Sequence, residues 1–448
     1  MTATVTQSPS YTIGNTQAPL PPLVDGLPIL GSALDLKQGP IQFAVKNYHE
    51  HGSVFRAKAI GREMFFMAGI EANQIAREAD HILFTNERQF SWIPDQLGYS
   101  LIAEEGDDHN YMRKLLKPAY SRVQAAQRID VMTQIVDDFV DSLAVGDSFE
   151  VMPTMQELVV NQLGHVMLNF PVGDYFPDFK VFMSTMLAVG QRGTRPRWVY
   201  RLPFYRRAKA RTFEMAEKVI EYIRSTDAGV DRPRTAIDIM LEKPDASGQP
   251  HNQGQLLAEA MSPYLAGQDT VAGTLSFLWL LIHKHPDVQE RVTAEAREAF
   301  APDMSVGDLR QLDDIHKTIV ETMRRYPLGG LMPRHARCTF EFNGYRIPEG
   351  ASVFSALAVT HFLPEYYEDP YTFDIDRPAG PNGTFSPYGL GRHTCLGAGI
   401  ADVQLMVMIA AFLRRGRFQL DPVDYEMQLN TNPVPNPGHY RLKLVEKY

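Results

Sequence analysis

The stretch that decides the fold is Tyr388-Gly-Leu-Gly-Arg-His-Thr-Cys395-Leu-Gly397, which places a cysteine between a glycine-rich turn and an amphipathic run over residues 401–414. The period of that run predicts a helix, so the thiol precedes a helix N-terminus. Unpaired N–H groups and about half a positive charge at such a terminus favour a thiolate and moderate its donation to a metal. The pattern predicts a thiolate ligand, although a lone cysteine is more often buried and inert.

Composition and charge exclude several classes of protein. The chain has 448 residues, of which 44% are apolar and 22% charged, as in an ordinary globular protein with a large core. Length alone would allow about three domains, but we expect one catalytic domain over residues 41–448 after an extended Pro-rich arm over residues 1–40. The net charge of -9 argues against nucleic acid as a partner.

Targeting signals are not evident in the sequence. The first 25 residues lack the basic and apolar regions of a secretory signal. The longest strongly apolar stretch without a charge, Thr270 to Ile282, has 13 residues, fewer than the ~20 that a transmembrane helix needs. Two cysteines, Cys338 and Cys395, are too few for a disulfide framework. We therefore expect a monomeric, cytoplasmic protein without a transmembrane segment.

Helical periodicity dominates the middle of the chain. Apolar residues recur at i, i+3 and i+4 in three stretches, residues 131–143, 211–223 and 256–282. The last stretch lies in a long helix from Asn252 to His283, which ends before Pro286 because proline cannot continue it. β-rich runs predict small sheets at residues 53–67, at 333–359 and in the last thirty residues. The fold class is mainly α with small β-sheets around a long central helix.

The cysteine segment resembles the heme-binding loop of the cytochrome P-450 family, whose pattern is Phe-x-x-Gly-x-x-x-Cys-x-Gly. The resemblance extends over roughly residues 20–445, with further motifs in the family's order. It implies the cytochrome P-450 fold, a heme b cofactor (iron protoporphyrin IX) and Cys395 as the axial ligand of the iron. Tyr388 stands where the family has phenylalanine, so its phenol needs a hydrogen-bond partner. Gly389 permits close approach to a flat ligand.

A second motif pairs an acid with a base on one helix. Glu321 and Arg324 lie three residues apart, on one helical face where a buried ion pair can form. The run from Asp369 to Arg377 is similar to the family segment that returns an arginine to this pair. The resemblance implies a structural triad of Glu321, Arg324 and Arg377 that supports the cysteine loop and performs no chemistry.

Heme carries two propionates, so its site needs cations at fixed positions. His109 and Arg113 lie on one helical face, His393 lies two residues before the cysteine, and Arg334 opens a strand. By resemblance all four bind propionates, although each alone is typical of an ordinary solvated side chain. Arg337 competes for the strand position, which the family pattern assigns to Arg334.

The middle of the long helix holds the segment Ala266-Gly267-Gln-Asp269-Thr270. Ala266 and Gly267 let a flat macrocycle approach, and the Thr270 hydroxyl can bond to the preceding turn and widen it. The segment resembles the family's Ala-Gly-x-Asp/Glu-Thr motif. This resemblance implies that Thr270 and Asp269 deliver protons to O2, with Asp269 linked to solvent. A helix-packing notch with a capped polar pair is the alternative.

The motifs together imply a monooxygenase that inserts one atom of O2 into an apolar lipid, steroid, terpenoid or polyketide-like molecule. The acid and alcohol favour O2 and two electrons over hydrogen peroxide. Because 53 residues follow Cys395, we expect electrons, ultimately from NAD(P)H, to arrive from a separate ferredoxin or flavodoxin-type donor with its reductase. A basic surface for an acidic ferredoxin, or a merely solvated face, is offered by Lys114, Lys117, Arg392, Arg414 and Arg415.

The substrate pocket of the family is lined by regions that are largely apolar in this chain, which implies an apolar substrate. The candidate lining residues, any of which can instead be ordinary core, are Phe90, Trp92, Ile93, Tyr99, Leu101, Met186, Leu265, Leu331, Met332 and Leu429. The stretch Trp198 to Arg201 is either a lid or a surface patch.

Two alternatives share these motifs. A non-oxygenating member of the same fold would catalyse oxidative coupling, rearrangement or dehydration, and the motifs do not separate it from a monooxygenase. A heme-thiolate sensor or binding protein would need no proton relay, so Asp269 and Thr270 argue against it.

Overall fold

The structure, a computed structural model, describes residues 11–431 and 434–448, which form two compact units. Among the described residues, unit 1 comprises 11–90, 104–106 and 323–395, and unit 2 comprises 91–103, 107–322, 396–431 and 434–448. The first ten residues of the expected N-terminal arm lie outside the described residues. The remainder of the arm contains strand β1 (Tyr11–Ile13) and the short helix α1 (Ala33–Gln38).

Unit 1 carries two sheets, one of five strands in the order β2-β3-β9-β6-β4 and one of three in the order β1-β7-β8. The other strands are β2 (Val54–Ala59), β3 (Arg62–Ala68), β4 (Phe84–Thr85), β6 (Met332–Ala336), β7 (Phe340–Phe342), β8 (Tyr345–Ile347) and β9 (Ser352–Ala356). The other helices are α2 (Pro40–His51), α3 (Ile70–Glu78), α4 (Asp80–Leu83) and α5 (Glu87–Phe90). The β-rich runs predicted at residues 53–67 and 333–359 are therefore confirmed.

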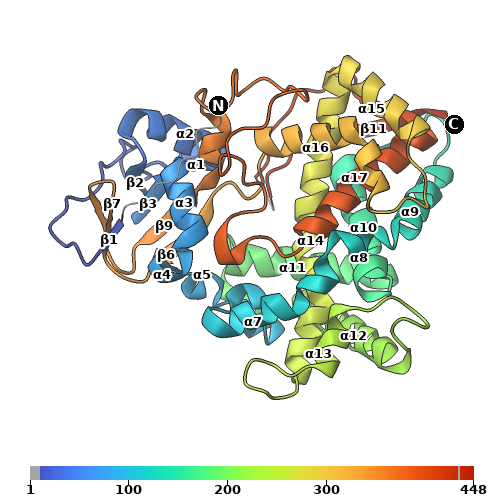
Figure 1. The fold of residues 1–448 in the computed structure, drawn as a ribbon, viewed down its shortest axis with the longest axis horizontal. Helices are drawn as coiled ribbons and strands as arrows, with labels where there is room; N and C mark the ends of the chain where they lie inside the picture. The colour runs from blue at the N-terminus through green and yellow to red at the C-terminus, as the bar shows by residue number, and fades with distance from the viewer. Residues whose placement is uncertain (1–10, 432–433) are drawn as a thin grey trace. The chain divides into compact units, whose positions relative to one another are not determined.

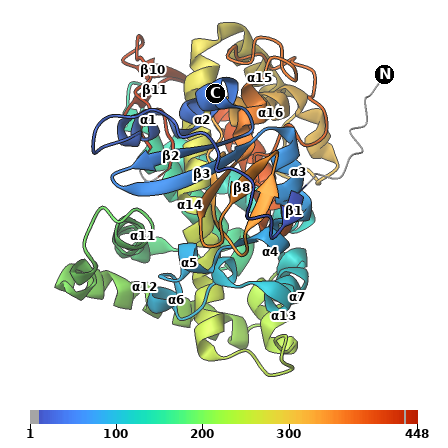
Figure 2. The same ribbon diagram turned by 90° about the vertical axis from the view of Figure 1, so that its left-hand side faces the viewer.

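The larger sheet separates two apolar clusters because successive side chains of a strand point to opposite faces. On β3, Phe65 and Met67 belong to one cluster, whereas Phe66 and Ala68 belong to the other. Helix α3 adds Ile75 to the first cluster, and α2 packs on the second. Figure 2 shows β2 and β3, the antiparallel hairpin of this sheet, running side by side. Both faces of the sheet are thus covered within unit 1.

Unit 2 holds most of the helices and a three-stranded sheet in the order β10-β11-β5. Its helices are α6 (Pro94–Leu97), α7 (Gly106–Leu116), α8 (Arg122–Ala126), α9 (Ile129–Ser142), α10 (Val151–Leu163), α11 (Phe176–Gly190), α12 (Pro203–Ser225), α13 (Ala236–Glu242), α14 (Gln253–Lys284), α15 (Pro286–Glu298), α16 (Asp313–Arg325, whose last turn belongs to unit 1) and α17 (Ala398–Arg415). Its strands are β5 (Ser148–Glu150), β10 (Gly416–Asp421) and β11 (Arg441–Lys447). All three helical stretches predicted from periodicity are confirmed.

Helix α14 is the central element of unit 2. It begins at a capping box, in which the Asn252 side chain accepts from the Gln255 N–H and the Gln255 side chain accepts from the Asn252 N–H. It ends at Lys284, directly before Pro286 opens α15. In Figure 1 it runs beside α10 and α17, with which it packs. Among the described residues only α14 is long and apolar enough to cross a membrane, but 78% of its most apolar window is buried in the protein, as in a core helix.

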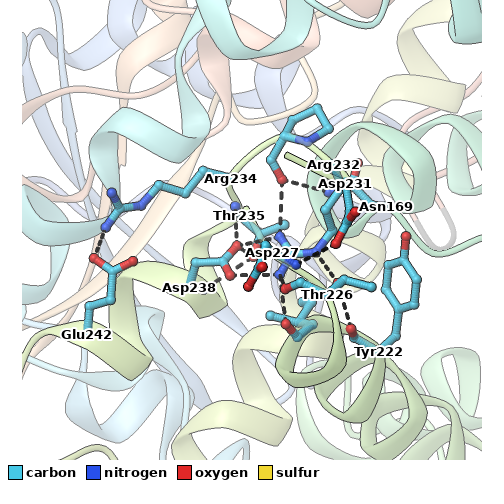
Figure 3. A network of polar contacts seen from close by, with 12 residues as sticks. Asn169, Tyr222, Thr226, Asp227, Asp231, Arg232, Arg234, Thr235, Asp238 and Glu242 are labelled. Carbon is cyan, nitrogen blue, oxygen red and sulfur yellow. Dashed lines mark hydrogen bonds and ion pairs between the residues drawn. The ribbon is translucent and has the colours of Figure 1, made fainter. Parts of the chain in front are cut away.

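A buried ion pair fixes the loop between α12 and α13 (Figure 3). The Arg232 guanidinium donates two hydrogen bonds to Asp238, 2.7 Å to Oδ2 and 2.8 Å to Oδ1. It also donates to the Ile223 carbonyl at 2.8 Å and to the Thr226 hydroxyl at 2.8 Å. Asp238 in turn accepts from Thr235, the N-cap of α13. The end of α12 and the start of α13 are therefore tied to a single arginine.

Candidate functional site

The cysteine loop belongs to unit 1 and closes on itself. The Cys395 N–H donates to the Tyr388 carbonyl at 2.8 Å. Gly391 has a φ of +76°, and a Cβ there would lie 2.2 Å from the Ala76 carbonyl oxygen, so only glycine fits. The Cys395 side chain is exposed, and α17 begins at Ala398. The predicted order of turn, cysteine and helix is confirmed, with the helix starting three residues earlier than its periodic run.

His361 anchors this loop through both of its ring nitrogens. Its Nδ1 lies 3.2 Å from the Arg324 carbonyl oxygen, and its Nε2 accepts from the Ser386 N–H at 3.1 Å. Because Nε2 accepts, Nδ1 carries the proton and the ring is neutral. Complete burial lowers the pKa of His361 to about 3, although the bond to Arg324 opposes the shift. A neutral histidine therefore joins α16 to the segment that precedes Tyr388.

The residues predicted to form the structural triad are found on α16 and in the loop that follows β9. Glu321 and Arg324 are both buried, with exposed fractions of 4% and 2%. Arg324 donates to the His361 carbonyl at 2.7 Å and to the Thr372 carbonyl at 3.3 Å. Arg377 donates to the same Thr372 carbonyl at 2.9 Å. The two arginines thus meet at one carbonyl of unit 1, and the charge pairing of the triad stays a prediction.

Two arginines on or next to β6 have different partners. Arg334 is buried, and its Nε donates to Asp80 Oδ1 at 2.9 Å while Nη1 donates to the Pro333 carbonyl at 3.0 Å. Arg337 donates to the Phe84 carbonyl and pairs with Glu105. A guanidinium has five N–H donors, so Arg334 retains donors beyond these two bonds. Its contact with a propionate stays a prediction.

The other expected propionate ligands lie on separate elements. His109 and Arg113 are on α7, where His109 is buried and Arg113 is half-buried. Their spacing of four residues places them on one helical face, as the sequence predicts. His393 is half-buried in the 3-10 turn Gly391–His393, beside the cysteine. Propionate binding by His109, Arg113 and His393 stays a prediction.

The middle of α14 exposes a narrow face. Ala266 and Thr270, one helical turn apart, are exposed, whereas Gln268 and Asp269 are buried. The Thr270 hydroxyl donates to the Ala266 carbonyl at 2.9 Å, which confirms the predicted bond to the preceding turn. The helix nevertheless remains α-helical throughout. An exposed small residue and an alcohol on a core helix provide an open surface for a flat ligand.

Gly267 faces a different neighbour. A Cβ at this position would lie 2.5 Å from Leu163 Cδ1, at the C-terminal end of α10. The glycine therefore allows α10 and α14 to pack closely. Ala266 is exposed and Gly267 is half-buried, and the approach of a macrocycle to the two residues stays a prediction.

Asp269 is held inside unit 2 rather than at its surface. Asp269 has an exposed fraction of 8%. Its Oδ1 accepts hydrogen bonds from Gln156 Nε2 at 2.7 Å and from Gln268 Nε2 at 3.0 Å. The guanidinium of Arg192 attracts the carboxylate electrostatically, while burial lowers the pKa of Arg192. The link of Asp269 to solvent stays a prediction, and the structure adds a buried partner, Gln156, that the sequence did not indicate.

The candidate pocket residues have varied surroundings within their units. The Trp92 ring packs against Gly190 of α11, where a Cβ would lie 2.3 Å from it. Met186 of α11 is buried, and Leu331 packs on an apolar cluster of unit 1. Leu429 is exposed, and so is Trp198 in the turn Arg197–Arg201. Trp92, Met186 and Leu331 thus have packing roles, and pocket lining by all ten candidates stays a prediction.

These features fit a heme held by a thiolate. Such a group needs an accessible sulfur, a flat approach and cations for its propionates. In unit 1 the exposed thiol of Cys395 precedes a helix, in a loop whose glycine leaves no room for a side chain. In unit 2 the exposed Ala266 and Thr270 interrupt an otherwise buried helix.

Comparisons with known proteins agree with this chemistry. The family model for Cytochrome P450 matches residues 21–444. The chain is 24% identical to "Cyclooctat-9-en-7-ol 5-monooxygenase" of Streptomyces melanosporofaciens, over 88% of this chain and 89% of that protein. It is also 24% identical to "Abscisic acid 8'-hydroxylase 4" of Arabidopsis thaliana, over 95% of this chain and 92% of that protein. Relatives in a bacterium and a plant do not single out the bacterial type that the sequence suggested.

A solved structure shares the fold. "Retinoic acid bound cyanobacterial CYP120A1" superimposes with a TM-score of 0.80, covering 96% of this chain and 100% of that chain at 23% sequence identity. The expected fold class, mainly α with small β-sheets, is confirmed.

Proposed function

The chain belongs to the cytochrome P450 family of monooxygenases, and we propose that it inserts one oxygen atom from O2 into an apolar small molecule of isoprenoid type. The observation that carries this proposal is the exposed Thr270 beside the buried Asp269 on α14. The reaction, R–H + O2 + 2 e⁻ + 2 H⁺ → R–OH + H2O, consumes two protons. An acid and an alcohol on the central helix suit that requirement.

The family implies a heme-thiolate cofactor, which when bound supplies the reductive activation of dioxygen. Cys395 would hold it through sulfur, and the bond from the Cys395 N–H to the Tyr388 carbonyl fixes the loop around that sulfur. His109, Arg113, Arg334 and His393 would hold the propionates.

Thr270 and Asp269 would handle the protons. The Thr270 hydroxyl donates a hydrogen bond to the Ala266 carbonyl. The lone pairs of its oxygen are therefore left to accept a hydrogen bond at the exposed face. Asp269 Oδ1 is fixed by two amides, and the carboxylate would pass protons from the interior of unit 2 to that face.

The substrate class rests on support of two kinds. Abscisic acid and retinoic acid, which appear in the names of two similar proteins, are both isoprenoid carboxylic acids. The ten candidate pocket residues are apolar or aromatic, which suits such molecules. Electrons would come from NAD(P)H through a separate ferredoxin or flavodoxin-type donor, since the family requires a redox partner.

The cofactor assignment is tested by exchanging each cysteine in turn. Cys395→Ser should abolish the red-shifted absorption band of the reduced carbon monoxide complex, because that band requires thiolate ligation. Cys338→Ser, which removes the other, half-buried cysteine, should leave the band unchanged. Loss of the band in both variants, or in neither, would contradict ligation by Cys395.

The proton role is tested with two threonines one helical turn apart. Thr270→Ala should lower the product formed per electron pair several-fold with retinoic acid as the probe, because one donor or acceptor in proton transfer is lost. Thr274→Ala removes a buried hydroxyl that donates to the Thr270 carbonyl at 3.0 Å, and should leave the ratio near that of the wild type. Equal ratios in the wild type and Thr270→Ala would contradict the relay.

A further inference from the structure

The carboxylate of Asp269 is contacted by two amide side chains, of which Gln156 lies outside the sequence motifs and Gln268 is the variable residue of the motif on α14. Gln156, on α10, places its Nε2 2.7 Å from Asp269 Oδ1. Gln268, the preceding residue on α14, places its Nε2 3.0 Å from the same oxygen. All three side chains are buried. The Arg192 guanidinium also attracts the Asp269 carboxylate electrostatically.

Both amides must act as donors in this arrangement. An ionised carboxylate only accepts hydrogen bonds, so each glutamine turns its NH2 group toward Oδ1. For Gln268 this leaves Oε1 buried without a hydrogen-bond partner among the residues that the structure describes. A buried acceptor without a partner is unfavourable. Gln268 therefore donates to Asp269 although its own carbonyl oxygen has no partner among the described residues.

The two oxygens of Asp269 are consequently different. Two N–H donors occupy Oδ1, and a proton on Oδ1 would have to displace one of them. Over residues 11–431 and 434–448 no hydrogen bond to Oδ2 is seen. A proton therefore enters and leaves more readily at Oδ2.

The bond from Gln156 differs in kind from the bond within α14. Gln268 and Asp269 are adjacent, so their contact moves with the helix. Gln156 lies on another helix, 113 residues away in sequence. Its bond therefore ties the carboxylate on α14 to the neighbouring helix α10.

We infer that Gln156 is a positioning residue for proton delivery, which holds Asp269 Oδ1 so that Oδ2 is the oxygen that exchanges protons. This inference rests on the proposed function, since it assigns a partner to the acid of the proposed relay. Gln156 itself need not touch substrate or cofactor.

The test compares two buried glutamines of α10. Gln156→Met removes the donor to Asp269 and preserves side-chain length. Gln162→Met is the matched control, because Gln162 is buried on the same helix but donates to the Met132 carbonyl at 2.8 Å and accepts from Gln404 at 3.0 Å. Both variants lose a buried amide, so a merely structural effect should be similar in the two.

The first measurement does not depend on catalysis. The infrared carboxylate stretch of Asp269 is isolated as the difference between the wild type and Asp269→Asn. We expect this band to shift in Gln156→Met, because one hydrogen bond to the carboxylate is lost, and to keep its frequency in Gln162→Met. An unchanged band in Gln156→Met would overturn the inference. If Gln156→Met does not fold, Gln156→Leu, which is uncharged and also lacks the N–H donor, takes its place with the same expectation.

The second measurement uses heme-loaded protein and retinoic acid as the probe. Gln156→Met should lower product per electron pair several-fold when a reductase supplies the electrons. The deficit should disappear when hydrogen peroxide drives the reaction, because R–H + H2O2 → R–OH + H2O needs no further protons. Equal coupling in Gln156→Met and Gln162→Met would overturn the inference.

The two proposals fail in distinguishable ways. If Asp269→Asn uncouples the reaction and Gln156→Met does not, the acid is needed but its positioning by Gln156 is wrong. If Asp269→Asn leaves coupling unchanged, the proton role in the proposed function is itself wrong.

Discussion

Glu259 is an acid inside the core of unit 2 whose partner is neutral. It lies on α14 with an exposed fraction of 5%, and the Tyr120 hydroxyl donates to its Oε1 at 2.6 Å. Burial raises the pKa of Glu259 from 4.5 to about 7, while the bond from Tyr120 opposes the shift. A carboxyl that prefers its neutral form makes the folded state hold a proton that the unfolded chain releases.

This predicts a specific pH dependence of stability. Between about pH 4.5 and 7 the folded state binds more protons at Glu259 than the unfolded state, so the free energy of unfolding falls as pH rises. Glu259→Gln should remove this pH dependence, which lowers the free energy of unfolding by up to about 3 kcal/mol across the window. Denaturant unfolding at several pH values measures it, with the exposed Glu157→Gln as control. A wild-type-minus-Glu259→Gln difference that stays constant across the window would refute the prediction.

The sequence predicted residues whose chemistry is local and missed those whose role depends on distant contacts. Cys395 and Thr270 stand in contiguous motifs, so their neighbours already indicate their chemistry. The residues next to Gln156 and His361 in the sequence do not indicate which side chains or carbonyls they contact. Their partners, Asp269 and Arg324, are far along the chain, and only the packed helices bring them together.

The same division holds for the elements. The long helix α14 and the hairpin β2-β3 follow from periodicity, with Pro286 and Gly61 marking ends and turns. The short helix α13 was not predicted, although Thr235 and Asp238 form its capping box. The strand order of the five-stranded sheet was also beyond the sequence, because β3 pairs in parallel with β9 across a long separation. Local patterns carry no information on such pairing.

The buried ion pair of Arg232 with Asp238 should contribute strongly to the stability of the loop between α12 and α13 (Figure 3). Arg232→Met should destabilise the protein by about 3–5 kcal/mol, because Asp238 would remain buried without its partner. Arg234→Met, which breaks only the exposed pair with Glu242, should cost less than about 1 kcal/mol. Denaturant unfolding compares the two variants. Equal losses would show that burial of the pair with Asp238 is unimportant.

The ion pair of Arg232 with Asp238 should also make the stability of the protein depend on pH in the acid range. Although burial opposes ionisation, hydrogen bonds from Arg232 and Thr235 lower the pKa of Asp238. A carboxyl with a lowered pKa contributes stability above its unfolded value of 3.8, and the contribution is lost as pH falls through the folded value. The difference in stability between the wild type and Asp238→Asn should therefore shrink as pH falls below about 4.

Charge is the property of the whole molecule that bears on its electron donor. The net charge is -9, so an acidic donor is repelled on average and needs a local basic surface. Of the five cations proposed for that surface, two are engaged: Arg414 pairs with Asp137 at 2.7 Å, and Arg415 pairs with Asp137 at 3.5 Å and with Asp141. These pairs reduce their contribution to a positive field. Lys114 and Lys117, in contrast, are exposed.

Reversal of these two lysines should therefore slow reduction by an acidic [2Fe–2S] ferredoxin. For Lys114→Glu/Lys117→Glu we expect the second-order rate constant, followed in a stopped-flow instrument as the carbon monoxide complex forms, to fall about 10-fold or more at low salt. The deficit should narrow at high salt, because the screening length shrinks from about 10 Å at 0.1 M to about 3 Å at 1 M. Arg206→Glu/Arg207→Glu changes the net charge equally at exposed positions of α12. If both double variants slowed reduction to the same extent, total charge rather than a surface at Lys114 and Lys117 would govern the encounter.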